Sequence, residues 1–174
     1  MRLKRIEHWD QVSFCRLFSK SASRPMFALC FWWSKTADGP LYLLIALLLL
    51  SFDIAGAESF IQLLLAAFAL ELPLYLILKN GIKRARPADV LQGTISAHII
   101  PSDRFSLPSG HTAGAFLFAL AIIIYFPSLT AIALLWAVGI GLSRIMLGVH
   151  FPLDVIAGAL LGSSCVVTMY MVFL

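Results

Sequence analysis

The stretch RIMLGVHFPLDV, residues 144–155, interrupts the most apolar part of the chain. From position 111 to the last residue the only formally charged side chains are Arg144 and Asp154, and both lie in this stretch beside His150. Charged groups next to apolar helices carry a large desolvation cost, so they commonly serve binding or catalysis. Apolar segments precede and follow the stretch, and we therefore expect two helices to meet at a polar site here.

The composition of the whole chain indicates a membrane protein. Of its 174 residues, 60% are hydrophobic and only 13% are charged, and the mean hydropathy is +0.92. A soluble domain of this size could not bury so much apolar surface. The three cysteines form no CxxC or Cys/His pattern, so we expect no disulfide framework, metal or cofactor. The N-terminus lacks the pattern of a removable signal peptide and is expected to be retained.

Hydropathy divides the chain into apolar segments near the length of about 20 residues that a transmembrane helix needs. Polar stretches and the helix breakers Gly and Pro separate them. We therefore predict an all-α fold, an integral membrane bundle of five to six transmembrane helices. The five predicted spans are Gly39–Ala55, Ser59–Leu78, Ser109–Phe126, Leu129–Leu147 and Pro152–Leu174.

Two shorter N-terminal pieces, around residues 4–19 and 25–35, are expected to lie at the membrane interface. The second piece is too short to cross, and its paired tryptophans before Lys35 are typical of anchoring at the headgroup level. The alternative is a sixth, tilted span through residues 22–38. We thus divide the chain into an N-terminal interfacial segment, residues 1–38, and a transmembrane domain, residues 39–174.

Three polar clusters flank the predicted spans. They are KNGIKRARPAD (79–89), LPSGHTAG (107–114) and the opening stretch extended to Ser143. A tight turn at FPSL, residues 126–129, makes the third and fourth spans a hairpin. The start of the third span, the end of the fourth and the end of the second then lie on the same membrane face. The three clusters are therefore predicted to converge.

The converging residues suit a phosphoryl group. Lys79, Arg86 and Arg144 supply positive charge, and guanidinium groups match phosphate oxygens in pairs. The third span begins at Ser109 and Gly110, so backbone N–H groups and the positive end of a helix dipole point to the same place. This pattern predicts an anion site.

Two histidines and a carboxylate add chemistry to this site. A neutral histidine is a good nucleophile when a partner orients it, and Asp154 follows His150 by four residues. We interpret His150 as the nucleophile and His111 as the general acid that protonates the departing alkoxide. Because fixed cations neutralise the phosphoryl oxygens, no metal is required.

Three motifs in this region carry a resemblance to a known family. They are KNGIKRARP (79–87), PSGH (108–111) and SRIMLGVHFPLD (143–154). In order and spacing they resemble the motifs of the type 2 phosphatidic acid phosphatases, which are membrane lipid phosphatases. The resemblance implies six spans, with three before the first motif, where hydropathy predicts two and an interfacial segment. It also implies a phosphohistidine on His150, protonation of the leaving group by His111, orientation of His150 by Asp154, and phosphate binding by Lys79, Arg86, Ser109, Gly110 and Arg144.

The expected function is hydrolysis of a phosphate monoester or pyrophosphate on a lipid in the cell (inner) membrane. Phosphatidic acid, phosphatidylglycerol phosphate, polyprenyl pyrophosphate and phosphorylated lipid A all fit, because the motifs bind the phosphoryl group and not the tail. The alternatives are a lipid phosphotransferase, a phosphatase for soluble esters and, least favoured, a non-enzymatic anion-binding protein or transporter. A transporter would need polar residues along the spans, and spans three to five have them only near their ends. The expected partners are a lipid phosphate and the bilayer, with no nucleic acid.

Several further features leave alternatives open. Basic residues all fall on one face, which favours a cytosolic site, whereas relatives in bacteria mostly act on the outer side. Lys83 and Arg84 are interpreted equally as headgroup contacts or surface charge. Glu71 is expected to pair within the bundle or with a basic group. The pair Gly158 and Gly162 is expected to pack helices internally more than to form a dimer. His8 and His98 are interpreted as structural or surface groups.

Overall fold

The structure is a computed structural model that describes residues 2–101 and 103–173. Within these residues the secondary structure is helical, without strands. The elements are α1 (Arg2–Phe18), η1 (Ser19–Ala22), α2 (Arg24–Lys35), α3 (Pro40–Ser51), α4 (Ala57–Ile82), α5 (Pro87–Val90), α6 (Gly110–Tyr125), η2 (Pro127–Leu129), α7 (Thr130–Met146) and α8 (Pro152–Phe173).

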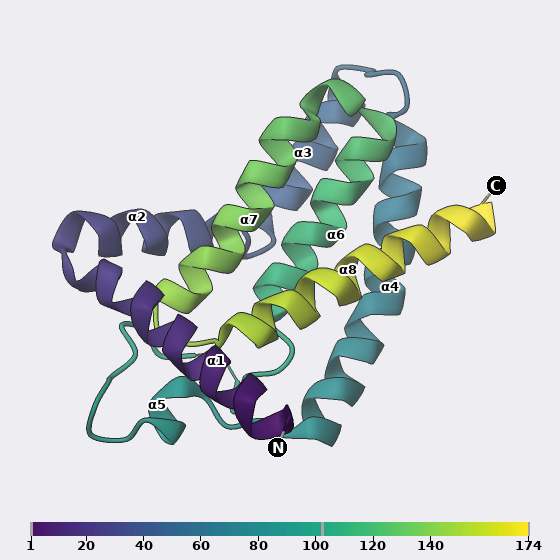
Figure 1. The fold of residues 1–174 in the computed structure, drawn as a ribbon. Helices are drawn as coiled ribbons and strands as arrows, with labels where there is room; N and C mark the ends of the chain where they lie inside the picture. Colours follow the sequence, from purple (N-terminus) through teal and green to yellow (C-terminus); the bar gives the residue numbers. More distant parts are fainter. Residues whose placement is uncertain (1, 102, 174) are drawn as a thin grey trace.

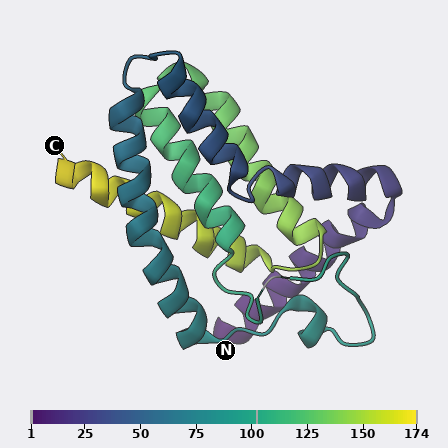
Figure 2. The same ribbon diagram turned by 180° about the vertical axis from the view of Figure 1, so that it is seen from behind.

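A bundle of five helices forms the body of the molecule (Figure 1). Helices α3, α6, α7 and α8 lie within predicted spans, whereas α4, Ala57–Ile82, extends the predicted span Ser59–Leu78 at both ends. Helix α6 packs against α7, α8 and α4, while α8 crosses the bundle obliquely. Seen from behind, α3 lies beside α6 and α7, and α2 leaves the bundle sideways from the lower end of α3 (Figure 2). The predicted all-α helical bundle is confirmed, and Leu174 lies outside the described residues.

Three helical segments are long and apolar enough to cross a membrane: Ala57–Val90, Pro127–Met146 and Pro152–Phe173. Helices α2 and α3 become a fourth if they count as one span that bends by 54°. Helix α6 is apolar but has 16 residues, fewer than the usual length of about 20. The chain is thus a multi-pass membrane protein, and five or six spans stays a prediction.

Proline and glycine set the helix boundaries near the polar clusters. A proline occupies the first turn of α3, α5 and α8, where its missing N–H costs no hydrogen bond. After α7, Gly148 has a φ of 82°, a conformation that glycine adopts without strain. This residue ends α7 and turns the chain through His150 into α8.

Helices α6 and α8 approach each other so closely that only glycine fits between them. A Cβ atom at Gly158 would collide with the backbone oxygen of Ser109, and one at Gly162 with that of Ala113. The predicted internal packing of the Gly158–Gly162 pair is therefore confirmed. This contact places the start of α8 directly against the start of α6.

Two hydrophobic layers hold the bundle and its N-terminal helices together. The main core combines alanine and leucine side chains with aromatic rings, and Tyr42 stacks on Phe118 at a centroid distance of 4.7 Å. Helix α1 packs Phe14 against Phe151, and α2 packs Cys30 against a cluster that includes Leu147. Both N-terminal helices thus cover the connection between α7 and α8.

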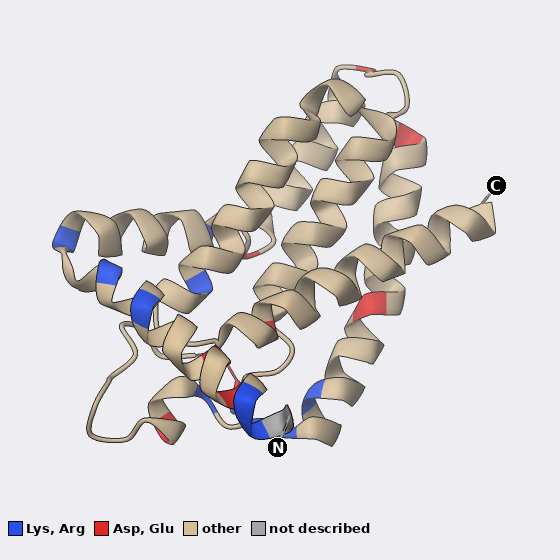
Figure 3. Cartoon of the chain, in the orientation of Figure 1, with Lys and Arg blue, Asp and Glu red and all other residues tan. Residues whose placement is uncertain are grey.

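Charge is distributed unevenly between the two ends of the bundle (Figure 3). Lys and Arg residues gather around α1, α5 and the lower end of α4, whereas the turn between α3 and α4 carries Asp53 and is followed by Glu58. The end with the basic residues is the one at which the polar clusters meet.

Candidate active site

The structure brings the three polar clusters together at one end of the bundle, as predicted. The backbone N–H of Ser109 donates to the carbonyl oxygen of Asp154 at 3.0 Å. Arg86 Nη1 donates to the carbonyl oxygen of Val149 at 2.5 Å, and Lys79 Nζ to that of Pro108 at 3.5 Å. These three bonds connect the clusters pairwise.

His150 lies in the connection between α7 and α8 and is almost completely buried, with 2% of its surface exposed. Its Nδ1 is 3.8 Å from Asp154 Oδ2, which is close enough for electrostatic attraction but too long for a hydrogen bond. This nitrogen has no other hydrogen-bond partner among the described residues. Burial lowers the pKa of His150 to about 4, and the neighbouring Arg144 and Arg86 act in the same direction. The imidazole is therefore neutral near pH 7, the form that a nucleophile requires.

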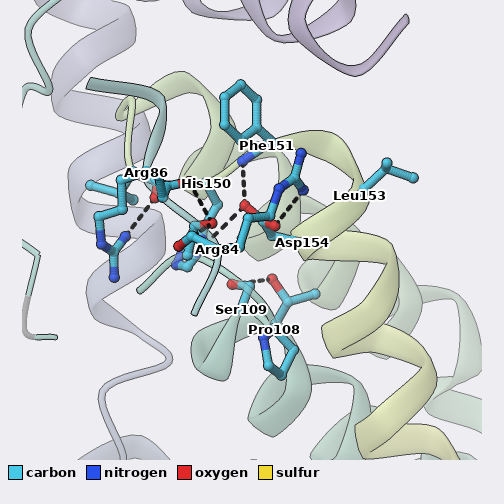
Figure 4. A network of polar contacts seen from close by, with 12 residues as sticks. Arg84, Arg86, Pro108, Ser109, His150, Phe151, Leu153 and Asp154 are labelled. Atoms are coloured by element: carbon cyan, nitrogen blue, oxygen red, sulfur yellow. Dashed lines mark hydrogen bonds and ion pairs between the residues drawn. The ribbon is translucent and has the colours of Figure 1, made fainter. Parts of the chain in front are cut away.

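Asp154 is held from two sides (Figure 4). Its Oδ2 accepts a hydrogen bond from the backbone N–H of Phe151 at 2.7 Å, and Oδ1 accepts one from Arg84 Nη1 at 2.6 Å. The Arg84 guanidinium also pairs with Asp10 of α1, whose other oxygen accepts the N–H of Leu153 at 2.9 Å. The interpretation of Arg84 as a simple surface charge is therefore wrong, and a headgroup contact stays a prediction. Lys83 is exposed.

The predicted phosphate-binding residues Lys79 and Arg86 share one carboxylate, that of Asp103. Lys79 Nζ is 2.8 Å from Asp103 Oδ2, and Arg86 Nη2 contacts Oδ1. Tyr75 donates to the same Oδ2 at 2.9 Å. Burial alone would raise the pKa of Asp103, but the bonds from Lys79 and Tyr75 and the charge of Arg86 hold this pKa below its usual value. Asp103 thus places two anionic oxygens against the two cations that the sequence predicts to bind phosphate.

Arg144 and His111 lie on the other side of the site and line a cavity of about 690 Å³. Arg144 Nη1 donates to Ser34 Oγ of α2 at 2.8 Å, and its buried Nε lacks a partner among the described residues. His111 Nε2 is 2.9 Å from Oδ1 of Asp38, which lies between α2 and α3. The cavity therefore has walls from the N-terminal helices as well as from the bundle.

The start of α6 is arranged as an anion site requires. Ser109 is its N-cap, and the Ser109 hydroxyl accepts a hydrogen bond from Thr112 at 2.9 Å. Gly110 lines the cavity, and a Cβ atom at this position would come within 3.0 Å of the Tyr75 ring. The N–H groups of the first turn have no acceptor in their own helix, so they are free to serve a ligand.

Two further predictions about single residues have different outcomes. Glu71 lines the cavity and makes no ion pair within the described part of the chain, so the predicted pairing is not observed. His98 stacks on Phe18 at 4.9 Å and hydrogen-bonds Ser21, which confirms a structural role. His8 is exposed.

Sequence patterns missed four polar residues of the site: Asp10, Ser34, Asp38 and Asp103. None of them belongs to one of the three motifs, and each lies 17 or more positions from its partner in the site. The one feature of the sequence that could have identified any of them is the position of Asp38 and of Asp103 along the chain. Asp38 directly precedes the Gly-Pro that opens the first predicted span, and Asp103 lies in the polar stretch between two motifs.

Comparisons with known proteins agree with this geometry. A family model described as the PAP2 superfamily matches residues 60–174. The lipid A 1-phosphatase of Rhizobium johnstonii is 38% identical over 92 residues, which cover 50% of this chain and 37% of that protein. The undecaprenyl-diphosphatase of Sulfolobus acidocaldarius is 34% identical over 101 residues, which cover 58% of this chain and 48% of that protein. The chain thus spans less than half the length of these two curated relatives.

A solved structure extends the likeness beyond the motifs. The crystal structure of Aquifex aeolicus LpxE superimposes with a TM-score of 0.78 at 28% identity, over 92% of this chain and 94% of that chain. The N-terminal helices are thus largely included in the shared fold.

Proposed function

The chain belongs to the PAP2 superfamily, and on that premise we propose that it is a metal-independent membrane phosphatase that removes a phosphate or diphosphate from a lipid. One observation carries the proposal. Lys79, Arg86 and the start of α6 meet the buried, neutral His150 at one end of the bundle. A site with fixed cations, helix N–H groups and a neutral imidazole suits phosphoryl transfer.

In the first half-reaction, His150 attacks phosphorus and a P–N bond forms. The P–O bond to the lipid breaks, its electron pair goes to the ester oxygen, and His111 gives this oxygen a proton. Lys79, Arg86 and Arg144 bind the three remaining phosphoryl oxygens and offset their charge. Asp154 stabilises the positive charge that develops on His150, because its Oδ2 is 3.8 Å from Nδ1.

In the second half-reaction, water attacks the phosphohistidine. His111, now neutral, accepts the proton of the attacking water, the P–N bond breaks, and its electron pair returns to His150. Phosphate then leaves the site, and both imidazoles have regained their starting protonation. The same two histidines serve both halves because the acid of the first step becomes the base of the second.

A lipid is the substrate class that best fits the location of the site. The cavity opens near the polar end of the bundle and is lined by apolar side chains, such as Phe31 and Phe68, as well as by His111 and Arg144. A phosphorylated headgroup can enter there while its acyl chains stay in the bilayer. Phosphatidic acid, phosphatidylglycerol phosphate, a polyprenyl pyrophosphate and a lipid A phosphate are all candidates.

We place the protein in the cell (inner) membrane, with residues 1–38 as an interfacial segment and 39–174 as the transmembrane phosphatase domain. Labelling can determine which side the site faces. In a variant without Cys15, Cys30 and Cys165, the exposed Ser96 is changed to Cys and intact cells are treated with an impermeant thiol reagent. Labelling would exclude a cytosolic site.

The direct test of function is phosphate release by purified protein in detergent with a chelator present. We expect release from at least one of the four lipids, and inhibition by vanadate, which imitates the phosphoryl transition state. Activity that disappears with the chelator would contradict metal independence. Transfer of phosphate to a second lipid, detected by product analysis, would indicate a phosphotransferase. No turnover of any phosphate ester would overturn the proposal.

A further inference from the structure

Asp38 makes a direct contact with one of the two proposed catalytic histidines. Its Oδ1 is 2.9 Å from His111 Nε2, and its Oδ2 is 2.8 Å from Lys35 Nζ. Asp38 lies between α2 and α3, 73 positions before His111. Both side chains line the same cavity and are partly exposed to it, at 32% and 26%. The contact therefore lies where a substrate would meet His111.

We propose that Asp38 is the positioning residue for His111, holding its ring so that Nδ1 exchanges the proton with the leaving group. The inference rests on the proposed function, because it assumes that His111 acts as the general acid. A carboxylate bound to Nε2–H fixes the tautomer and orientation of an imidazole, and it favours the charged imidazolium. Nδ1 is then the nitrogen that remains for the ester oxygen.

The two histidines of the site differ in their distance from the nearest carboxylate. Asp154 Oδ2 is 3.8 Å from His150 Nδ1, and the carboxylate is also engaged by Arg84 and the Phe151 amide. Asp38 is within hydrogen-bond distance of His111 and has one oxygen committed to it. The shorter contact suits a proton donor, because a carboxylate at hydrogen-bond distance favours the imidazolium against the burial and the cations that oppose it.

Other charged groups also act on His111, and a pH test must include them. Burial of the ring, Arg144 on α7 and Lys35 beside Asp38 disfavour the imidazolium, whereas Asp38 favours it. Glu71 on α4 and Tyr42 on α3 line the same cavity. Within this set Asp38 is the acidic group in contact with the ring. Its removal should therefore make His111 a weaker proton donor.

The experiment compares Asp38→Asn with wild type on two esters. A lipid phosphate releases an alkoxide, which needs a proton, whereas p-nitrophenyl phosphate releases a stable phenolate, which does not. We compare kcat/KM, which reports the steps up to departure of the leaving group and not the hydrolysis of the shared phosphohistidine. We expect kcat/KM for the lipid to fall about tenfold to hundredfold, and kcat/KM for the aryl ester to change less than about threefold. The alkaline limb of the pH–rate profile for the lipid should move to lower pH. Equal losses on both esters, or none, would overturn the inference.

Three further variants separate a positioning role from a structural one. Asp38→Glu retains the carboxylate and should recover part of the lipid activity, while Asp53→Asn at the opposite end of the bundle is the matched control. In a His111→Ala background, Asp38→Asn should cause no further loss, and an undiminished loss there would also refute the inference. If wild type hydrolyses no phosphate ester, the proposed function fails; if wild type is active and the variants do not show this pattern, the role of Asp38 alone fails.

Discussion

The site has two halves that differ in accessibility and in how their charges are compensated. His111 and Arg144 line an open cavity and are contacted by Asp38 and Ser34 from the N-terminal helices. His150 is buried, and the nearby Lys79 and Arg86 are paired with Asp103. The half with His111 and Arg144 is thus open to the cavity, whereas the half with Lys79 and Arg86 already holds a carboxylate.

The difference follows from the cost of burying charge. Two buried cations without partners would be expensive, and a bridging carboxylate offsets that cost. Asp103 is on a connection between helices and is about one-third exposed, so it can leave without disturbing the bundle. A phosphate carries more charge than one carboxylate, and the proposed function has it also contact Arg144 and the N–H groups of α6. We therefore expect a bound phosphate to replace Asp103, and four predictions test the difference between the two halves.

The largest effect is expected for His150→Ala, which removes the proposed nucleophile. Turnover should fall at least about 1000-fold, because no P–N bond can form, while the helical content stays unchanged. Phosphate release and circular dichroism measure the two quantities. The exposed His8→Ala is the control, and substantial activity remaining in His150→Ala would exclude a phosphohistidine at this position.

A smaller effect is expected for Arg84→Gln in the buried half. This change leaves Asp10 and Asp154 buried without their shared cation, which should lower the free energy of unfolding by about 3–5 kcal/mol. Thermal unfolding in detergent measures the loss, and Lys83→Gln next to it should change stability by less than about 0.5 kcal/mol. Equal stability of the two variants would mean that Arg84 contributes no more than a surface charge.

The pH dependence should also reflect the burial of His150. At pH 5.5 a histidine of ordinary pKa, about 6.5, is roughly 90% protonated, whereas one with a pKa of about 4 is mostly neutral. Lowering the pH to 5.5 should therefore not cause the roughly tenfold loss of kcat/KM that an ordinary nucleophilic histidine would show. The profile is corrected for the second ionisation of the phosphate substrate. A remaining acid limb near pH 6.5 would contradict a neutral, buried nucleophile.

The smallest effect is expected for Asp103→Asn. The neutral amide no longer competes with an anion for Lys79 and Arg86, so inhibition by inorganic phosphate should strengthen about threefold, a change of less than about 1 kcal/mol. The inhibition constant for phosphate measures it, with Glu58→Gln at the far end as the control. Weaker inhibition would show that Asp103 supports the phosphate site instead of occupying it.

Much of the candidate site could be predicted from the sequence, because its residues lie in short motifs with recognisable spacing. The spacing of Lys79 and Arg86, the helix start at Ser109 and the interval from His150 to Asp154 are each readable within one short segment. The hairpin turn at residues 126–129 and the number of membrane crossings between the three segments then place all of them on the same membrane face. The supporting carboxylates could not be predicted, because an isolated aspartate in a loop or an amphipathic helix has no pattern that identifies its partner.

The N-terminal helices illustrate the same limit. Hydropathy predicts that they form a separate interfacial segment. In the structure, Asp10 of α1 pairs with Arg84, and Asp38 of the α2–α3 connection contacts His111. Their apolar residues, such as Phe14 and Cys30, bury themselves against the connection that carries His150. Amphipathic periodicity states that a helix has an apolar face, but it does not state what covers that face.

The order and spacing of polar residues along an apolar chain thus determined the membrane bundle, the family resemblance and the residues expected to act on phosphate. These properties depend on short-range geometry and on the cost of placing charge near lipid. Only the tertiary structure decided that Asp10 faces Arg84, that Asp38 faces His111 and that Asp103 faces Lys79 and Arg86, because those pairs join residues 17 to 74 positions apart. The distance between two such residues depends on how all the helices pack. The close crossing of α6 and α8, for example, brings Ser109 into contact with Asp154.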